Sequence, residues 1–383
     1  MDNFFQIIPL GEVLRFGNGK SIKPGGSGRY LVYGSNGVIG GSDEYRHENG
    51  IIIGRVGAYC GSVSYCPSRF WASDNTLVAF PSSDDHDTKF LYYLLVDAKL
   101  SRHAGGAAQP LVTQGVLKQV EAKVPPLPIQ RRIAGILSAY DDLIENSQRR
   151  IKILEEMARR LYREWFVYFR FPGHEGCRFV ESPLGEIPEG WEVRKLRDVC
   201  RLTMGQSPKS ETYNELGNGM AFHQGVSDFG NRYPTDRLFC TADGRMAEAG
   251  DILFSVRAPV GRMNIANKPI ILGRGLSAIR HLQDFQAFLW EQLRNSFTKI
   301  DMIGNGAIFA SVTKEDMQGI DLLCPPHPLV VAATNYIEPL HSEIATLSQQ
   351  IPSLRLTRDL LLPRLLSGQI DVEALPEPVL SEL

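Results

Sequence analysis

The sequence lacks the cysteine patterns that cross-link small secreted domains or bind zinc. Its six cysteines are scattered along 383 residues, and no two of them form a CxxC pair. Neither a disulfide framework nor a zinc site is therefore expected. We expect a cytoplasmic protein with reduced thiols.

Long apolar runs are also absent. The longest one, around residues 90–96, contains two tyrosines and is far shorter than the roughly 20 residues that a membrane helix needs. The opening residues MDNFFQIIPLGE lack the basic start and apolar stretch of a signal peptide. With 43% hydrophobic and 22% charged residues, the composition is that of an ordinary globular protein without a membrane partner.

Motifs that carry catalysis are missing as well. The segment Gly17-Asn18-Gly19-Lys20-Ser21 resembles the end of a phosphate-binding loop, but Leu14 stands where that motif requires a glycine. There is no HExxH pair, no GxSxG elbow and no Asn/Asp-Pro-Pro-Tyr/Phe motif of amino-methyltransferases. These absences favour a binding protein with no catalytic residue, metal or cofactor of its own. An enzyme that retains some catalysis and a protein-binding module without a DNA role remain alternatives.

Charge does not decide the partner. The net charge is −2, yet residues 245–280 hold six basic side chains against two acidic ones. A local patch of this kind can supply phosphate contacts although the total charge is near zero. A solvated surface explains the same pattern equally well.

What the sequence does contain is an internal repeat. A shift of 200 residues aligns glycines, prolines and apolar residues of the two halves, and near their starts Gly19-Lys20-Ser21 corresponds to Gly205-Gln206-Ser207 at a slightly smaller shift. The aligned segments are residues 50–53 with 250–253, Val56, Ala58 and Gly61 with Val256, Ala258 and Gly261, residues 112–113 with 312–313, and residues 125–128 with 325–328. A single offset kept over so many positions indicates two copies of one unit.

Each copy begins with a region of mixed secondary structure. Short β-like runs at residues 30–33, 50–53 and 251–256 are separated by Gly, Asn and Ser, and helices are expected at residues 89–100 and 285–297. The pattern predicts a compact globule of the α+β or mixed α/β class in each copy.

Each copy then continues, after its Pro-Pro pair, into a long helical stretch. Apolar residues there alternate steps of three and four, which is the seam of a coiled coil. The seam positions are Ile133, Leu137, Tyr140, Ile144, Ser147, Ile151, Leu154, Ala158, Leu161 and Trp165, and then Ile337, Leu340, Ile344, Leu347, Ile351, Leu354, Leu361 and Leu365. The two seams are expected to pair as an antiparallel coiled coil, although packing of each helix on its own globule is an alternative. Pro339 and Pro352 predict that the second helix is bent or broken near Pro352.

Both copies carry small, polar and basic residues in glycine-rich loops. Gly54-Arg55-Val56-Gly57-Ala58 pairs with Ser255-Val256-Arg257-Ala258, and Lys20-Ser21 pairs with Gln206-Ser207-Pro208-Lys209. Side chains of these types can read base edges or hold phosphates. For any one of them, a role as an ordinary surface or turn residue is also open.

Four segments together resemble a known family. They are residues 125–137 (PPLPIQRRIAGIL), residues 187–193 (IPEGWEV), residues 250–253 (GDIL) followed by Arg257 and Gly261, and residues 358–370 (RDLLLPRLLSGQI). In this order they resemble the specificity subunits of type I restriction-modification systems. None is specific alone, but the match spans nearly the whole chain and the duplication is part of the family pattern.

The resemblance implies a monomer of two tandem, pseudo-repeated target recognition domains separated by two long helices. The corresponding segments are residues 1–125 for the first domain, 126–170 for the first helix, 171–186 for a linker, 187–325 for the second domain, 326–371 for the second helix and 372–383 for an acidic tail. Each domain would read one half of a bipartite site in double-stranded DNA, with the helices as a ruler for the gap.

The resemblance also implies partners. Two methyltransferase subunits would bind alongside and methylate adenine with S-adenosylmethionine, and two ATP-dependent motor-nuclease subunits could join, so that S-adenosylmethionine, ATP and Mg are expected on the partners. The DNA-facing residues implied are Lys20, Ser21, Arg55, Gln206, Ser207, Lys209, Arg257, Arg262 and Arg274, and the partner-facing residues are Gln130, Ile133, Leu137, Arg358 and Leu361. Two departures concern the partner contact: Ile129 replaces an acidic residue, and Pro328-Leu329-Val330 replaces the Glu-Gln pair in the second copy.

Overall fold

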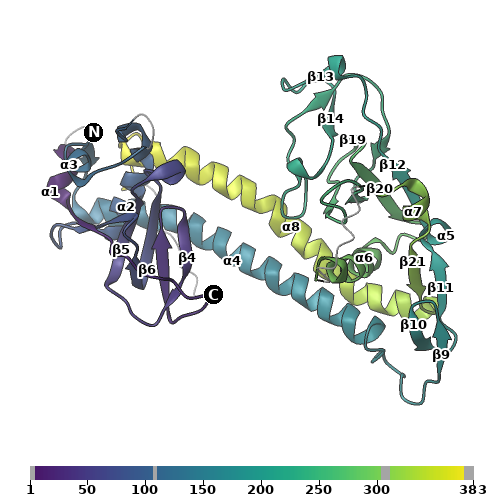
Figure 1. The fold of residues 1–383 in the computed structure, drawn as a ribbon. Coiled ribbons are helices and arrows are strands. Elements are labelled where there is room, and N and C mark those ends of the chain that lie inside the picture. The colour runs from purple at the N-terminus through teal and green to yellow at the C-terminus, as the bar shows by residue number, and fades with distance from the viewer. Residues whose placement is uncertain (1–4, 107–109, 303–310, 375–383) are drawn as a thin grey trace. The chain divides into compact units, whose positions relative to one another are not determined.

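The computed structural model describes residues 5–106, 110–302 and 311–374. The chain divides into two compact units, Met1–Asn146 with Gln350–Leu383, and Ser147–Gln349. Each unit contains one mixed α/β domain, half of helix α4 (Leu127–Phe166) and half of helix α8 (His327–Leu366) (Figure 1). Among the described residues, no helix is long and apolar enough to span a membrane.

The first domain is built around a six-stranded sheet of order β2-β7-β5-β6-β3-β4. The first and last strands of the domain, β1 and β8, form a separate antiparallel pair. The elements are β1 (Gln6–Pro9), α1 (Leu10–Val13), β2 (Leu14–Asn18), β3 (Tyr30–Gly34), β4 (Gly37–Ser42), β5 (His47–Gly54), η1 (Gly57–Tyr59), β6 (Val63–Ala72), β7 (Thr76–Pro81), α2 (Thr88–Asp97), η2 (Leu100–His103), α3 (Gln114–Lys118) and β8 (Glu121–Val124).

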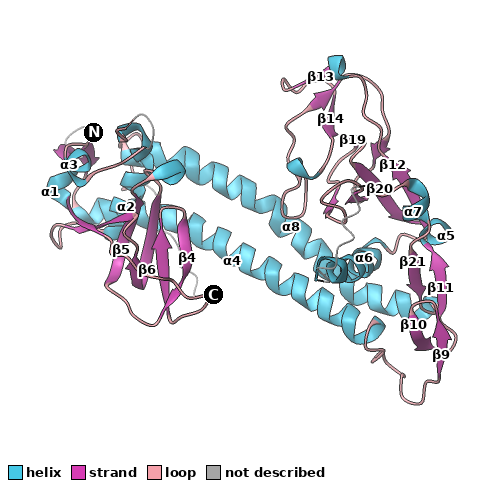
Figure 2. Cartoon of the chain, in the orientation of Figure 1, coloured by secondary structure: helices cyan, strands magenta, loops and turns pink. Residues whose placement is uncertain are grey.

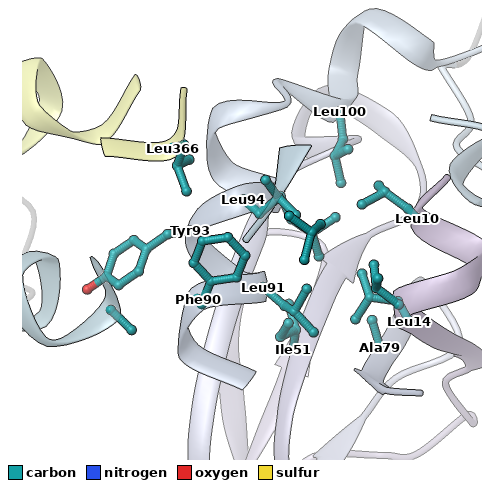
Figure 3. Close-up of a cluster of buried hydrophobic side chains, with 14 of the residues drawn as sticks. Leu10, Leu14, Ile51, Ala79, Phe90, Leu91, Tyr93, Leu94, Leu100 and Leu366 are labelled. Atoms are coloured by element: carbon teal, nitrogen blue, oxygen red, sulfur yellow. The ribbon is translucent and has the colours of Figure 1, made fainter. Parts of the chain in front are cut away.

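Helix α2 covers one face of this sheet and closes the core of the first unit. The Asp87 carboxylate caps its N-terminus by accepting from the Phe90 N–H (2.8 Å), which satisfies a backbone donor that the helix leaves free. Phe90 and Leu91 are fully buried against Ile51 of β5 (Figure 3). The expected strands at residues 30–33 and 50–53 and the expected helix at residues 89–100 are confirmed, with the helix ending at Asp97.

The second domain has a four-stranded sheet, β12-β20-β17-β18, and a five-stranded one, β13-β15-β14-β19-β16 (Figure 2). Its elements are β11 (Glu192–Lys195), α5 (Leu196–Val199), β12 (Cys200–Met204), η3 (Ser210–Thr212), β13 (Tyr213–Asn214), β14 (Met220–His223), η4 (Val226–Asp228), β15 (Phe239–Cys240), β16 (Met246–Ala247), β17 (Ile252–Ser255), β18 (Met263–Ile265), β19 (Ile270–Leu272), β20 (Leu276–His281), α6 (Gln286–Met302), α7 (Lys314–Gln318) and β21 (Asp321–Cys324). A hairpin of β9 (Phe179–Ser182) and β10 (Gly185–Pro188) precedes it. The strand expected at residues 251–256 and the helix expected at 285–297 are confirmed.

The two domains repeat the same local order. Strands β1 and β8 pair Gln6 with Val124, and β11 and β21 pair Glu192 with Cys324 in the same way. Short helices α1 and α5 follow, and α3 and α7 are both capped by a threonine, Thr113 or Thr313. The internal repeat read from the sequence is therefore a structural repeat.

Within each unit the two long helices run antiparallel and share the core of the domain. In the first unit Ile133 and Leu137 of α4 belong to the same buried cluster as Leu365 of α8. In the second unit Ala158 and Tyr162 of α4 pack in one cluster with Ala333 and Ile337 of α8. Seam positions near the helix ends, such as Ile133 and Ile337, therefore pack against the other helix and against the domain at once, which combines the two arrangements considered from the sequence.

Of the bend or break predicted near Pro352, the break is wrong. Helix α8 is continuous from His327 to Leu366, through Pro339 and Pro352. Both prolines are exposed, so water can take up the carbonyl groups that lose their helical hydrogen bond. Neighbouring residues Ile351 and Ile344 are buried, and their packing offsets the cost of about 3 kcal/mol that an interior proline brings.

Replacing Leu137 with Ala should lower the free energy of unfolding of the first unit by about 2–5 kcal/mol, because a fully buried side chain is removed from the cluster. The matched control is Leu143→Ala on the same helix, whose side chain is 51% exposed. Denaturant titration should show a large shift for the first variant and almost none for the second. Equal shifts would contradict the packing described.

Candidate nucleic-acid interface

The loops at one end of the main sheet of the first domain are tied together by backbone hydrogen bonds. This loop end comprises the residues after β2 and β5 and those between β6 and β7. Gly19 N–H donates to the Thr76 carbonyl (3.0 Å), Lys20 N–H to that of Ala72 (2.9 Å) and Arg55 N–H to that of Asn75 (2.9 Å). Three loops from distant parts of the sequence are thus fixed side by side.

The second domain repeats this arrangement at the corresponding loop end. Gly205 N–H donates to the Leu276 carbonyl (2.9 Å), Gln206 N–H to that of Leu272 (2.9 Å) and Val256 N–H to that of Gly275 (2.9 Å). The correspondence of Gly19-Lys20 with Gly205-Gln206 predicted from the sequence is therefore confirmed, since the same bonds hold both dipeptides.

The first glycine of each dipeptide is required by the close approach of two backbones. A Cβ on Gly19 would lie 1.8 Å from the Ser73 carbonyl oxygen, and a Cβ on Gly205 would lie 2.1 Å from that of Gly273. Any side chain at these positions would push the loops apart.

The predicted DNA-facing residues of the first domain lie at its loop end. Lys20 and Ser21 are exposed, and the Lys20 carbonyl accepts from the Trp71 indole N–H (2.8 Å). Arg55 is half-buried, and its carbonyl accepts from Val112 N–H (3.0 Å). Lys20 therefore offers its charge to solvent more fully than Arg55 does.

In the second domain, most of the predicted residues are exposed at or near the loop end. They are Gln206, Lys209, Arg257, Arg262 and Arg274. Ser207 is half-buried, and its hydroxyl accepts from the Arg274 N–H (3.2 Å). The Lys209 ammonium is 3.9 Å from the Glu211 carboxylate, and the Arg262 N–H donates to the Ser255 hydroxyl (2.8 Å).

The loop end brings two of these arginines together. Arg257 and Arg274 line a hollow of about 230 Å³ with Gln224, Gly225 and Gly275. Gln224 was not singled out from the sequence, because the repeat gives it no polar counterpart.

The repeat offset of 200 residues needs one correction inside strands β5 and β17. Gly54 lies opposite Thr76 as Ser255 lies opposite Leu276. The same shift holds at the bridges Val56 to Leu111 and Arg257 to Ser311. The offset here is therefore one residue larger, so Val56 corresponds to Arg257 and not to Val256. The loop after β17 is one residue shorter than the loop after β5, which restores the offset of 200 from that point on. Arg55 corresponds to Val256, as the bonds of their N–H groups show, so Arg55 and Arg257 lie one position apart.

A second basic surface of the first domain was missed from the sequence. Arg46 lies over the Trp71 ring (5.6 Å to the ring centre), Arg69 over Tyr45 (4.6 Å) and Arg29 over Tyr30 (5.5 Å). Stacking on aromatic rings holds guanidinium groups in place, and the Arg69 guanidinium also donates to the Glu48 carboxylate (3.2 Å). The available signal was the adjacency of arginine and aromatic residues in the sequence, as in Arg29-Tyr30 and Tyr45-Arg46.

The predicted partner-facing residues of α4 are turned inward. Gln130, Ile133 and Leu137 are at most 1% exposed, and the Gln130 side chain accepts from Asp87 N–H (2.9 Å) and donates to the Pro125 carbonyl (2.8 Å). Their side chains are occupied by the core of the first unit and cannot form a partner surface in this packing. We therefore correct that expectation for these three residues.

The predicted partner-facing residues of α8 are also engaged within the first unit. The Arg358 guanidinium donates to the Asp141 carboxylate (2.5 Å), which also accepts from the Tyr93 hydroxyl. Burial, together with this bond to Asp141, raises the pKa of the Tyr93 phenol well above its ordinary value, so the hydroxyl stays protonated and keeps donating. Leu361 is half-buried against the core cluster.

No group of three or more His, Cys, Asp or Glu side chains in the described part of the chain could hold a metal ion. The loop ends present hydrogen-bond donors, acceptors and positive charge. These groups suit the binding of a polar, anionic surface.

Comparison with known proteins assigns the family. A family model for the type I restriction modification DNA specificity domain matches residues 4–156 and again residues 188–351. The chain belongs to this family. The two matches show that the repeat is a tandem pair of specificity domains, as the sequence predicted.

Two relatives and one solved structure illustrate the likeness. The putative type I restriction enzyme MjaX specificity subunit of Methanocaldococcus jannaschii is 32% identical over 84% of this chain and 76% of its own. The HindI specificity subunit of Haemophilus influenzae is 23% identical over 79% of this chain and 82% of its own. The crystal structure of a type I system S subunit from M. genitalium matches with a TM-score of 0.69, covering 96% of this chain and 97% of that one at 17% identity, which supports the fold. The predicted mixed α+β class, with two tandem domains and two long helices, is thus confirmed.

Replacing Gly19 with Ala should disrupt the loop end of this specificity domain. The added Cβ would meet the Ser73 carbonyl, and relieving such overlaps typically costs about 1–3 kcal/mol. We expect a lower thermal midpoint, measured by calorimetry, together with weaker binding to DNA. Gly26→Ala in the same loop is the control, since its Cβ would meet no atom within 4 Å. If Gly19→Ala behaved like this control, the close approach would not matter.

Proposed function

We propose that this specificity subunit reads a bipartite target in double-stranded DNA, one half with each domain. The observation that carries the proposal is the repeated loop end: the same backbone hydrogen bonds hold both, but the exposed side chains differ, with Lys20 in one and Gln206 in the other at the equivalent position. Phosphate contacts would position each domain, and a few base contacts would specify the sequence. The two halves of the target should therefore differ.

The long helices act as the spacer in this proposal. Each has 40 residues, which at ~1.5 Å per residue is roughly 60 Å of helix. Joining two weak reading domains through a stiff spacer makes the second contact intramolecular and raises its effective concentration. One domain alone would cover too few base pairs to select a site.

Partner subunits would supply the chemistry. We propose that two methyltransferase subunits bind along the helices and methylate adenine with S-adenosylmethionine, and that two ATP-dependent motor-nuclease subunits with Mg can join them. Since Gln130, Ile133 and Leu137 are buried, exposed apolar side chains on the helices are the better candidates for this contact. They are Leu143, Leu356 and Leu360 in the first unit and Ile153, Met157 and Tyr336 in the second, each at least 51% exposed.

Long-read methylation mapping tests this function. DNA from a host carrying the chain with its methyltransferase should show a split motif, two short blocks around a fixed gap, that is absent without the chain. No new methylation, with both proteins folded and present, would leave a protein-binding module or an inactive relative.

The same assay tests the spacer. Seven residues inserted within residues 140–156 and seven within 340–356 keep the helical seam in register and add ~10 Å. The methylated gap should then grow by about three base pairs, at 3.4 Å each. Seven residues inserted beside Gly176, in a turn outside the helices, should leave the gap unchanged. A gap that ignored the helical insertions would show that the helices are not the ruler.

A further inference from the structure

The hollow at the loop end of the second domain is built to hold three side chains in fixed places. The Gln224 carbonyl accepts from Gly275 N–H (3.1 Å), and the neighbouring His223 carbonyl accepts from Gly273 N–H (2.8 Å). Arg274 lies between these two glycines with its own N–H bonded to Ser207, and Arg257 pairs with Ser311 in a β-bridge. Backbone contacts therefore fix all three residues while their side chains remain available.

The two guanidinium groups at the hollow differ from other arginines of this domain. Arg237 is bonded to Asp228 and Arg280 to Asp251, and Arg232 is buried beside His341. Arg257 and Arg274 are exposed and make no ion pair or side-chain hydrogen bond with the described residues. Two unneutralised donors at one glycine-lined hollow call for an acceptor-rich ligand.

The first domain has none of these side chains at the equivalent positions. Ser73 N–H donates to the Tyr33 carbonyl (2.9 Å) as Gly273 does to that of His223, so Gly34 corresponds to Gln224. Asp74 corresponds to Arg274, and Val56 to Arg257 as the bridges show. The two loop ends thus share a backbone but differ in the side chains at these three positions, and at one of them Asp74 replaces the positive charge of Arg274. Different side chains on one backbone are what reading two different sequences requires.

We infer that Arg257, Arg274 and Gln224 are specificity-determining residues that read the major-groove edge of a guanine-containing step in the half-site of the second domain. This inference rests on the proposed function. The arginine fork offers two parallel N–H donors that match the O6 and N7 acceptors of guanine, and the glutamine amide can pair with the donor and acceptor of a neighbouring adenine. A phosphate offers acceptors only, so it could use the amide N–H of Gln224 but not its amide oxygen, whereas a base edge can use both.

The test separates fork geometry from charge. Purified chain with its methyltransferase binds a DNA library in which the second half-site is randomised and the first is fixed, and the selected sites are sequenced for wild type, Arg257→Lys, Arg274→Lys and Gln224→Leu. Lysine keeps the charge and loses the fork. We expect each arginine variant to lose about ten-fold or more of the preference for guanine at one position. Gln224→Leu should relax the neighbouring position, and preferences in the first half-site, tested with a second library, should not change.

The control is Arg201→Ala. Arg201 lies at the opposite end of β12 from the loop end, opposite Arg280 in the sheet and paired with Glu248, so its removal should leave base preferences unchanged.

Two results would overturn the inference. If the lysine variants keep every base preference, while alanine variants weaken binding to all sequences and lower the salt dependence by about one ion each, the hollow binds phosphate. If the relaxed positions fall in the first half-site, the hollow is assigned to the wrong half. Failure of the wild-type complex to select any split site would instead refute the proposed function.

Discussion

The close approach of backbones at the loop end of each domain is the constraint on which the rest of the structure depends. Gly19 and Gly205 lie so near a facing carbonyl that no side chain fits, and hydrogen bonds from these dipeptides tie together loops from distant parts of the chain. Because main-chain atoms carry this framework, exposed side chains can change without altering it. One scaffold can therefore present Asp74 in one copy and Arg274 in the other.

The long helices stabilise this framework. In the first unit Ile133 and Leu137 are buried with residues of the sheet and of α2, so the helix completes the core of the domain. The contact between Arg358 and Asp141, reinforced by the Tyr93 hydroxyl, adds a polar tie among α8, α4 and α2. A partner that binds the helices consequently meets their outer faces.

The sequence predicted the repeat, the strands and the long helices because these depend on local periodicity and on glycine and proline spacing. It could not predict that Gln130 would be buried, since a heptad pattern shows an apolar face without showing what covers it. The extra residue of offset that makes Val56 the counterpart of Arg257 was hidden by the compensating shorter loop. Gln224 was missed because it directly follows β14, and the parallel pairing of β14 with β19 places it at the loop end. That pairing joins segments about 50 residues apart, which local sequence does not show. The break near Pro352 was predicted wrongly because the free-energy cost of a helical proline can be read from the local sequence. The tertiary packing that offsets this cost cannot.

The most direct test of two reading sites on one scaffold is to give both copies the same side chains. Strands β1 to β8 (residues 6–124) can replace β11 to β21 (residues 192–324), because the terminal strand pairs have the same register. Methylation mapping of host DNA carrying this chimera and the methyltransferase should reveal a split motif in which the block read by the second domain is replaced by a second copy of the block read by the first. A motif that kept its original second block would contradict the account, because the sequence would then be read outside the loop ends.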